Sequence, residues 1–317
     1  MFLNLKNHCL IKSIIKVYHT CDGISHSFHN KSHEYISKMG DPKFISSVVK
    51  ENLKNRDFLR KKWLSSEIPK LTIYEDENIT LTYHLFFPVT SLKADNAAYL
   101  IHHHGDYLLS SNILFGSGYH SIEFEEQIDK NSNGSYRLSI KNDFFHSIGN
   151  TNLLDARIPH VIFNVSNPTV SVALWSKSQS KVDALKKKHD NKNRLNYTLF
   201  KKRFQGIYED EFFSGISSDP QFEHNSEKHI QGVCYFIQKM GFYDKDCISD
   251  VLQSPNLNPL WKKWLLYLKK EKQIQIPCFI DSINTLGCKI TKDDIRLACK
   301  VQNPNNRFFN FFNGKKR

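Results

Sequence analysis

Three consecutive histidines are the residues of this chain best suited to chemistry. They lie within residues 97–116, which read AAYLIHHHGDYLLSSNILFG. If residues 99–107 form a β-strand, successive side chains alternate between its faces, so His102 and His104 share one face and His103 lies on the other. Two imidazoles on one face can bind one metal ion, at Zn–N distances of about 2.0–2.1 Å. A third ligand must come from elsewhere, and without one the tract is a histidine cluster that holds no metal.

A run of short predicted β-strands surrounds the histidines. Between residues 70 and 176 apolar and polar residues alternate, Val, Ile, Tyr, Phe and Thr are frequent, and Asn, Asp, Gly and Pro separate the segments. Because no helical pattern interrupts them, these strands indicate a sandwich or small barrel. Residues 131–134, Asn-Ser-Asn-Gly, are the clearest hairpin signal in this region.

The region before the predicted strands divides into two parts. Residues 1–40 are weakly patterned and rich in His, Ser and Lys, so we expect a weakly ordered extension. Residues 41–69 contain a predicted helix over 42–65, since Asp41 can cap its N-terminus and Pro42 suits its first position.

The region after the predicted strands also divides into two parts. Residues 177–206 form an expected basic linker, in which Lys and Arg far outnumber Asp. Aromatic residues between the basic ones could stack on bases and so favour nucleic acid, but a solvated linker has the same composition. Residues 207–317 are predicted to be mainly helical: apolar stripes run through 224–240 and 259–270, and residues 291–294 resemble a capping box.

Composition and charge limit the protein classes further. The 317 residues carry a formal net charge of +12, which favours an anionic partner but does not choose one. The seven cysteines are widely spaced and form no C-x-x-C pair, so we expect a reducing compartment rather than a disulfide framework. No apolar run reaches the roughly 18 residues of a membrane span, and the N-terminus is a poor signal peptide. We therefore expect a cytoplasmic protein without a transmembrane segment.

The histidine region resembles the first sequence motif of the cupin superfamily. That motif is H-x-H, four residues, a glutamate, six residues and a glycine. His102 and His104 match the histidines and Gly116 matches the glycine, whereas Leu109 stands where the glutamate would be. The resemblance implies a double-stranded β-helix, or jelly roll, over residues 70–176, in a mainly β protein flanked by helices.

The second cupin motif is matched in part, in the correct order along the chain. Gly149 takes the position of its first glycine, and His160 with Asn164 matches the histidine that is followed four positions later by asparagine. Asp155 and Arg157 stand where the motif has proline and glycine, so this half is degenerate. His146 is a competing third ligand, but the motif spacing favours His160.

The ligand set that this resemblance implies is His102, His104 and His160, without a carboxylate. Three imidazoles around Fe(2+) resemble the thiol dioxygenases of the cysteamine and plant cysteine oxidase type, and Mn, Zn or Ni are alternatives. Three such ligands leave coordination positions open, and the uncompensated positive charge favours an anionic substrate. Tyr107, Tyr119 and Arg157 are the candidate catalytic residues, as hydroxyls near the metal or as a partner of a substrate carboxylate.

The sequence thus leads to one main functional hypothesis and two alternatives. The first is an oxygen-dependent oxidoreductase that acts on a small thiol or carboxylate compound. The second is a non-catalytic metal- or ligand-binding cupin whose basic helical regions bind a protein or nucleic-acid partner. The third is a metal-dependent isomerase, lyase or hydrolase, because a fold alone does not fix a reaction.

Overall fold

The structure of the chain is a computed structural model. It describes residues 5–21, 26–60, 68–87, 107–124, 129–130, 136–137, 140–155, 158, 160–162, 165, 167–177, 222–242 and 244–277.

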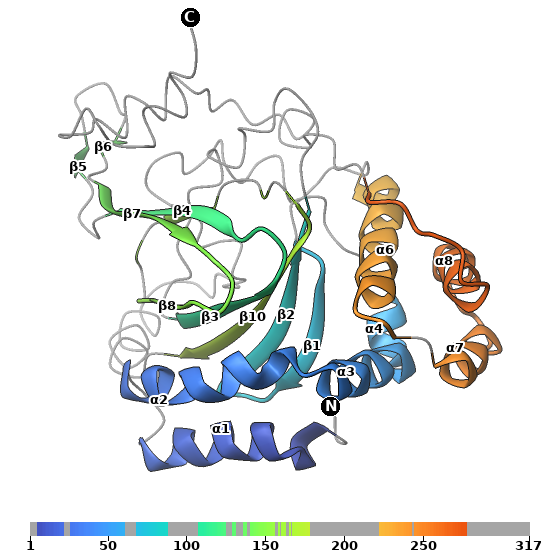
Figure 1. Cartoon of the computed structure of the whole chain (residues 1–317), viewed down its shortest axis with the longest axis horizontal. Coiled ribbons are helices and arrows are strands. Elements are labelled where there is room, and N and C mark those ends of the chain that lie inside the picture. The colour runs from blue at the N-terminus through green and yellow to red at the C-terminus, as the bar shows by residue number, and fades with distance from the viewer. Residues whose placement is uncertain are drawn as a thin grey trace, which may run out of the picture.

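Two helices stand where the sequence suggested a weakly ordered extension, so that prediction was wrong. After the short turn η1 (Leu5–Asn7) come α1 (Cys9–Thr20), α2 (His26–Ser37) and the turn η2 (Lys38–Gly40). Figure 1 shows α2 lying along the five-stranded sheet with α1 outside it. The apolar pattern of α2 is weak because its buried face includes the polar residues His29 and Ser32.

The helix predicted after residue 41 begins as expected. The Asp41 carboxylate accepts a hydrogen bond from the Phe44 N–H at 2.9 Å, and Pro42 opens α3 (Pro42–Lys54). The predicted helix is interrupted at Asn55, however, and residues 61–65 lie outside the described residues. Asn55 has an extended backbone and its side chain caps α4 (Arg56–Arg60), so two helices replace the single one that the spacing predicted.

The β region begins and ends close to its predicted limits, from Lys70 to Lys177. One sheet has the order β1-β2-β10-β3-β8, with β1 (Lys70–Glu75), β2 (Ile79–Phe86), β10 (Thr169–Lys177), β3 (Tyr107–Phe115) and β8 (Thr151–Leu154). The other has the order β7-β4-β9, with β7 (Ile140–His146), β4 (Tyr119–Phe124) and β9 (His160–Ile162).

Every pair of neighbouring strands in the two sheets is antiparallel, and strands far apart in sequence, such as β2 and β10, lie side by side. Figure 1 shows β4 and β7 curving over β3 and β10. Two facing sheets with these crossovers make a mainly β, cupin-like double-stranded β-helix with flanking helices, as predicted. The predicted turn at 131–134 lies outside the described residues, but β5 (Asp129–Lys130) and β6 (Tyr136–Arg137) pair antiparallel on either side of it.

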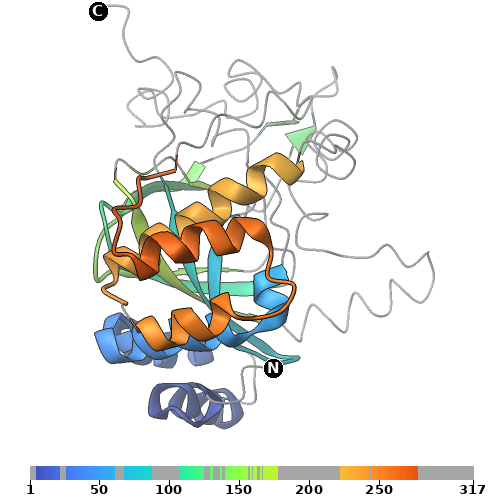
Figure 2. The same ribbon diagram turned by 90° about the vertical axis from the view of Figure 1, so that its right-hand side faces the viewer.

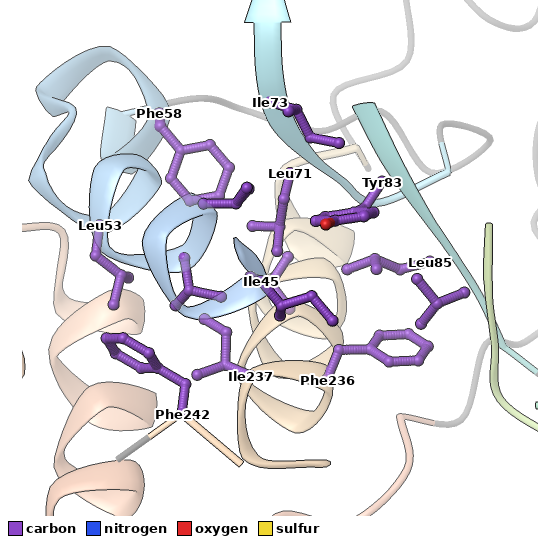
Figure 3. Packing of buried hydrophobic residues seen from close by; sticks show 14 of the residues in the cluster. Ile45, Leu53, Phe58, Leu71, Ile73, Tyr83, Leu85, Phe236, Ile237 and Phe242 are labelled. Atoms are coloured by element: carbon purple, nitrogen blue, oxygen red, sulfur yellow. The ribbon is translucent and has the colours of Figure 1, made fainter. Parts of the chain in front are cut away.

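The two faces of the five-stranded sheet have different partners. Leu81, Tyr83 and Leu85 of β2 join Val170 and Val172 of β10 in the main apolar core, which the helices complete. Figure 3 shows this core, where β-strand residues meet side chains of α3 and of the C-terminal helices. Residues of the opposite parity on these strands therefore face the second sheet.

The C-terminal region is helical where the structure describes it, as predicted. It contains α6 (Phe222–Lys239), α7 (Lys245–Leu252) and α8 (Pro259–Lys269), and Gly241 follows α6 with a positive φ of 73°. Figure 2 shows the three helices side by side over the β region. Most of the expected basic linker and the predicted capping box lie outside the described residues. None of the described helices is long and apolar enough to cross a bilayer.

Candidate functional site in the barrel interior

The inward face of β4 defines the interior between the two sheets. Tyr119 packs there against Ile113 of β3 and Val165. Strand alternation places Ser121 and Glu123 on the same face as Tyr119, and both are buried. The Glu123 side chain reaches Asn152 on β8, a strand of the other sheet, so this face looks across the barrel.

His160 also faces the interior. It is paired directly with Glu123 across β4 and β9, and directly opposite residues share one face of a sheet. Its side chain is only 3% exposed. Nδ1 lies 3.1 Å from the carbonyl oxygen of Ile158, and a carbonyl can only accept, so Nδ1 carries the proton. In the neutral ring Nε2 then bears the lone pair.

Glu123 is the acidic residue of this interior face. Its carboxylate accepts hydrogen bonds from Asn142 Nδ2 at 2.7 Å and Asn152 Nδ2 at 3.2 Å. Asn142 is on β7 and Asn152 on β8, so the two amides hold the carboxylate from strands of different sheets. Glu123 was not among the candidate site residues predicted from the sequence. The alternation of YHSIEF signalled its face, but its pairing with His160 is visible only in the sheet register.

Tyr119 and His146 form a separate pair. The Tyr119 hydroxyl lies 3.1 Å from His146 Nδ1, and His146 Nε2 donates to the Asn150 carbonyl at 2.8 Å. Burial lowers the pKa of His146, and the Asn150 hydrogen bond offsets part of that shift. Burial also raises the pKa of Tyr119 to about 12, against a smaller opposite effect of its hydrogen bond with Ser111.

The Tyr119–His146 pair and the Glu123–His160 pair lie at different levels of the barrel. Tyr119 is directly opposite His146, and Glu123 is directly opposite His160. Four residues along β4 correspond to roughly 13 Å at about 3.3 Å per residue. Two ligands of one metal ion can be only about 4 Å apart, given metal–nitrogen distances near 2 Å. His146 and His160 therefore cannot hold the same ion, and both ring nitrogens of His146 already have partners.

Strand β3 carries two of the predicted site positions. Ser110 bonds His29 of α2, so even-numbered residues face the helices and Tyr107 and Leu109 face the interior. Leu109 is paired with Leu154 on β8 and Trp175 on β10. An apolar residue thus stands at the position that the cupin motif gives to glutamate.

The two motif glycines lie in turns that side chains would disrupt. Gly116, between β3 and β4, has φ 98°, and a Cβ there would lie 2.2 Å from the Pro168 carbonyl oxygen. Gly149, between β7 and β8, has φ 79° and donates to the Ile113 carbonyl at 2.9 Å. Both positions are in the left-handed region that glycine adopts readily. The motif spacing therefore corresponds to real turns of the barrel.

Several predicted site residues lie outside the described residues: His102, His103, His104, Arg157 and Asn164. Within the described part of the chain, no group of three His, Cys, Asp or Glu side chains is placed to hold a metal ion. A metal centre built on His160 therefore depends on ligands from the undescribed segment.

Comparisons with known proteins found similarity only at a low level. No family model matches the chain, and no curated protein matches it. Among solved structures, an RmlC-like cupin family protein of Methanocaldococcus jannaschii aligns with a TM-score of 0.24 and 14% identity, over 41% of this chain and 91% of that one. The cupin domain of Cnp3 from Schizosaccharomyces pombe aligns with a TM-score of 0.25 and 9% identity, over 40% and 71%.

A third solved structure, an uncharacterized conserved protein with a double-stranded beta-helix domain from Klebsiella pneumoniae, gives a TM-score of 0.23 and 11% identity, over 36% of this chain and 79% of that one. Similarity at this level carries no argument about activity. The strand order and register of the two sheets are what identify the chain as a cupin-like double-stranded β-helix with helical flanks.

Proposed function

We propose that this chain is a metal-dependent cupin in which His102, His104 and His160 hold one divalent ion. The observation that carries the proposal is the hydrogen bond from His160 Nδ1 to the Ile158 carbonyl. A metal-binding histidine typically donates its other ring N–H to a carbonyl or carboxylate, which fixes the tautomer and the direction of the ligating nitrogen. His160 has this arrangement and faces the barrel interior.

The direction of the chain determines the end of the barrel at which β3 begins. The turn at Gly116 joins β3 to β4, so Tyr119 lies near that turn and Glu123 lies away from it. Tyr107 is the β3 residue farthest from the same turn. Tyr107, where β3 begins, therefore lies at the end of the barrel at which Glu123 and His160 lie.

The reaction that fits this site best is oxidation of a small thiol or carboxylate compound by dioxygen. Ferrous iron held by neutral imidazoles would supply redox chemistry and open coordination positions there. Tyr107, on the interior face of β3, and Arg157 are the residues we assign to substrate. The Tyr119 hydroxyl is bonded to His146, so we assign Tyr119 to support of the barrel.

A cytoplasmic location belongs to the same proposal. The four cysteines within the described residues, Cys9, Cys21, Cys234 and Cys247, are free thiols. Free thiols are typical of proteins kept in a reducing compartment.

Metal analysis of three purified proteins tests the metal site. We expect the wild type to contain close to one iron per chain and His160→Ala to lose most of it, because ligand loss removes a bond that other groups do not replace. His146→Ala, another buried barrel histidine, should keep its metal and serves as the matched control. If His160→Ala retains wild-type metal content, the site is wrong. Oxygen consumption with a panel of small thiols then tests the reaction.

A further inference from the structure

We propose that the outer face of α8 binds the phosphate backbone of nucleic acid. This surface, the basic face of α8, consists of Lys262, Lys263, Lys269 and Lys270. It lies outside the barrel, and its role does not depend on the metal site proposed above. The lysines recognise the partner by its charge, so the binding does not select a base sequence.

The helical period gathers the four lysines on one side of α8. Lys262 and Lys269 are seven residues apart, as are Lys263 and Lys270, and seven residues are about two turns of helix. All four side chains are exposed. Figure 2 shows α8 in front of α6, on the outside of the helical layer. The opposite face of α8 is buried in the core and comprises Trp261, Trp264, Leu265 and Leu268.

Most of the positive charge on this face is not neutralised within the described part of the chain. Helix α8 contains no acidic residue. Lys263 is paired with Glu227, at 2.5 Å between Nζ and Oε1. None of the ion pairs among the described residues involves Lys262, Lys269 or Lys270. These three ammonium groups can therefore bind an external anion without breaking any of those pairs.

Two more lysines extend the basic face beyond the end of α8. The Lys272 carbonyl accepts a hydrogen bond from Gln238 Nε2 at 2.9 Å, so Lys272 lies beside the last turn of α6, where Lys239 is exposed. The acidic residue nearest in sequence, Glu271, is paired with Lys245 at 2.6 Å. The positive surface thus continues from α8 to the end of α6.

Helix stability does not explain all of these lysines. The helix dipole favours cations in the last turn and acidic residues in the first. Lys269 and Lys270 are at the favourable end of α8. Lys262 and Lys263 are near the N-terminal end, which begins at Pro259 and has no acidic residue in its first turn, so they gain nothing from the dipole. A continuous basic stripe suits an external anion better than it suits the isolated helix.

The chemistry of this face favours nucleic acid over a membrane or an acidic protein. A helix that lies on a membrane buries its apolar face in lipid, but the apolar face of α8 is occupied by the core. Protein interfaces gain most of their affinity from large buried anchors, and none of the exposed large apolar side chains among the described residues is on α8. Duplex DNA carries one charge per about 1.7 Å and releases counterions when lysines bind, so charge alone provides affinity.

The same face offers no platform on which bases could stack. Base stacking needs exposed aromatic rings, whereas Trp261 and Trp264 are buried and Tyr267 is half-buried, with Lys272 Nζ 5.6 Å from its ring centroid. We therefore expect binding that depends strongly on salt and not on base sequence.

The experiment measures binding of the full chain to a DNA duplex of about 20 base pairs, by fluorescence anisotropy, at a series of salt concentrations. Log affinity falls with log salt concentration with a slope of about −0.9 per phosphate neutralised. The triple variant Lys262→Gln, Lys269→Gln, Lys270→Gln should therefore reduce the steepness of this slope by about 2.7. From about 50 to about 200 mM salt the wild type should lose about 40-fold more affinity than the variant, because basic residues elsewhere contribute equally to both.

Two controls separate this face from overall charge. The triple variant Lys6→Gln, Lys12→Gln, Lys16→Gln removes the same charge from exposed positions of η1 and α1, and Figure 1 shows α1 well apart from α8. It should keep the wild-type slope. Replacing Lys262, Lys269 and Lys270 with Arg keeps the charge and should also keep the slope. Duplexes of different sequence should bind the wild type equally.

Several results would overturn the proposal. One is a wild-type protein that does not bind the duplex at about 50 mM salt, well below physiological ionic strength. Another is a slope that the Gln substitutions on α8 leave unchanged, or that those on η1 and α1 reduce equally. Binding of polyglutamate, or of vesicles containing phosphatidylserine, without binding of the duplex would identify an acidic protein or a membrane as the partner instead.

Discussion

Lowering the pH from 8 to 5 should destabilise the protein through His29, a fully buried residue of α2. Its Nδ1 lies 2.8 Å from Ser110 Oγ and its Nε2 lies 2.9 Å from Ser176 Oγ. Burial, with smaller repulsions from His33 and His26, lowers the pKa of His29 from 6.5 to about 3, although Asp155 raises it slightly. The folded protein therefore keeps this ring neutral at pH values where the unfolded chain protonates it.

The size of the effect follows from the two pKa values. Between pH 6.5 and 3 the unfolded state binds more protons than the folded state, so stability falls as the pH falls through this range. pH 5 is 1.5 units below the pKa of the unfolded state, and each unit lowers the free energy of unfolding by about 1.4 kcal/mol, so the loss at pH 5 is about 2 kcal/mol. At pH 8 neither state carries the proton, and His29 contributes no pH dependence.

Urea denaturation at pH 8 and pH 5, followed by tryptophan fluorescence, measures the effect. Lowered pKa values at His33 and His146 destabilise the protein in the same direction, so the wild type alone does not isolate His29. His29→Gln removes the titrating ring and keeps groups that can bond both serines. We expect the wild type to lose about 2 kcal/mol more than this variant between the two pH values. His19→Gln, an exposed position on α1, should behave like the wild type. Equal losses in wild type and His29→Gln would refute the reasoning.

Two further substitutions test the barrel itself. Gly116→Ala should reduce the free energy of unfolding by about 2–4 kcal/mol, because φ is 98° and the new Cβ meets the Pro168 carbonyl. Gly241→Ala, with φ 73° and open space around the new Cβ, should reduce it by only about 1 kcal/mol. Urea denaturation at pH 8 measures both variants, and equal losses would contradict the steric argument. Tyr119→Phe should reduce the free energy of unfolding by about 1–3 kcal/mol, since His146 Nδ1 loses its hydrogen-bond partner inside the protein. The metal content of this variant should be unchanged, and loss of metal would place Tyr119 at the site after all.

The sequence predicted features that short stretches of chain determine. The cap formed by Asp41 and Pro42 depends on neighbouring residues, and the structure confirms it. The motif glycines Gly116 and Gly149 also fall in turns of the barrel. His160 could be placed on an interior strand because the motif spacing encodes a strand that follows a turn.

The features that the sequence did not reveal depend on contacts between distant segments. Helix α2 was missed because its buried face bonds to serines of β3 and β10 instead of presenting a plain apolar stripe. Glu123 was missed because only the pairing of β4 with β9 puts it opposite His160. Asn152 is likewise significant only because β8 and β4 lie across the barrel from each other. Strand register and packing between distant elements cannot be predicted from the local periodicity of apolar residues.

The two serines that hold His29 impose an order on assembly. Ser110 and Ser176 are on neighbouring strands, so their hydroxyls are correctly spaced only after β3 and β10 have paired in register. His29 and Ser176 are 147 residues apart in the chain. At a synthesis rate of about 5–20 residues per second, α2 leaves the ribosome roughly 7–30 s before its second partner. His29 can therefore make both hydrogen bonds only after β10 has been synthesised and has paired with β3 in register.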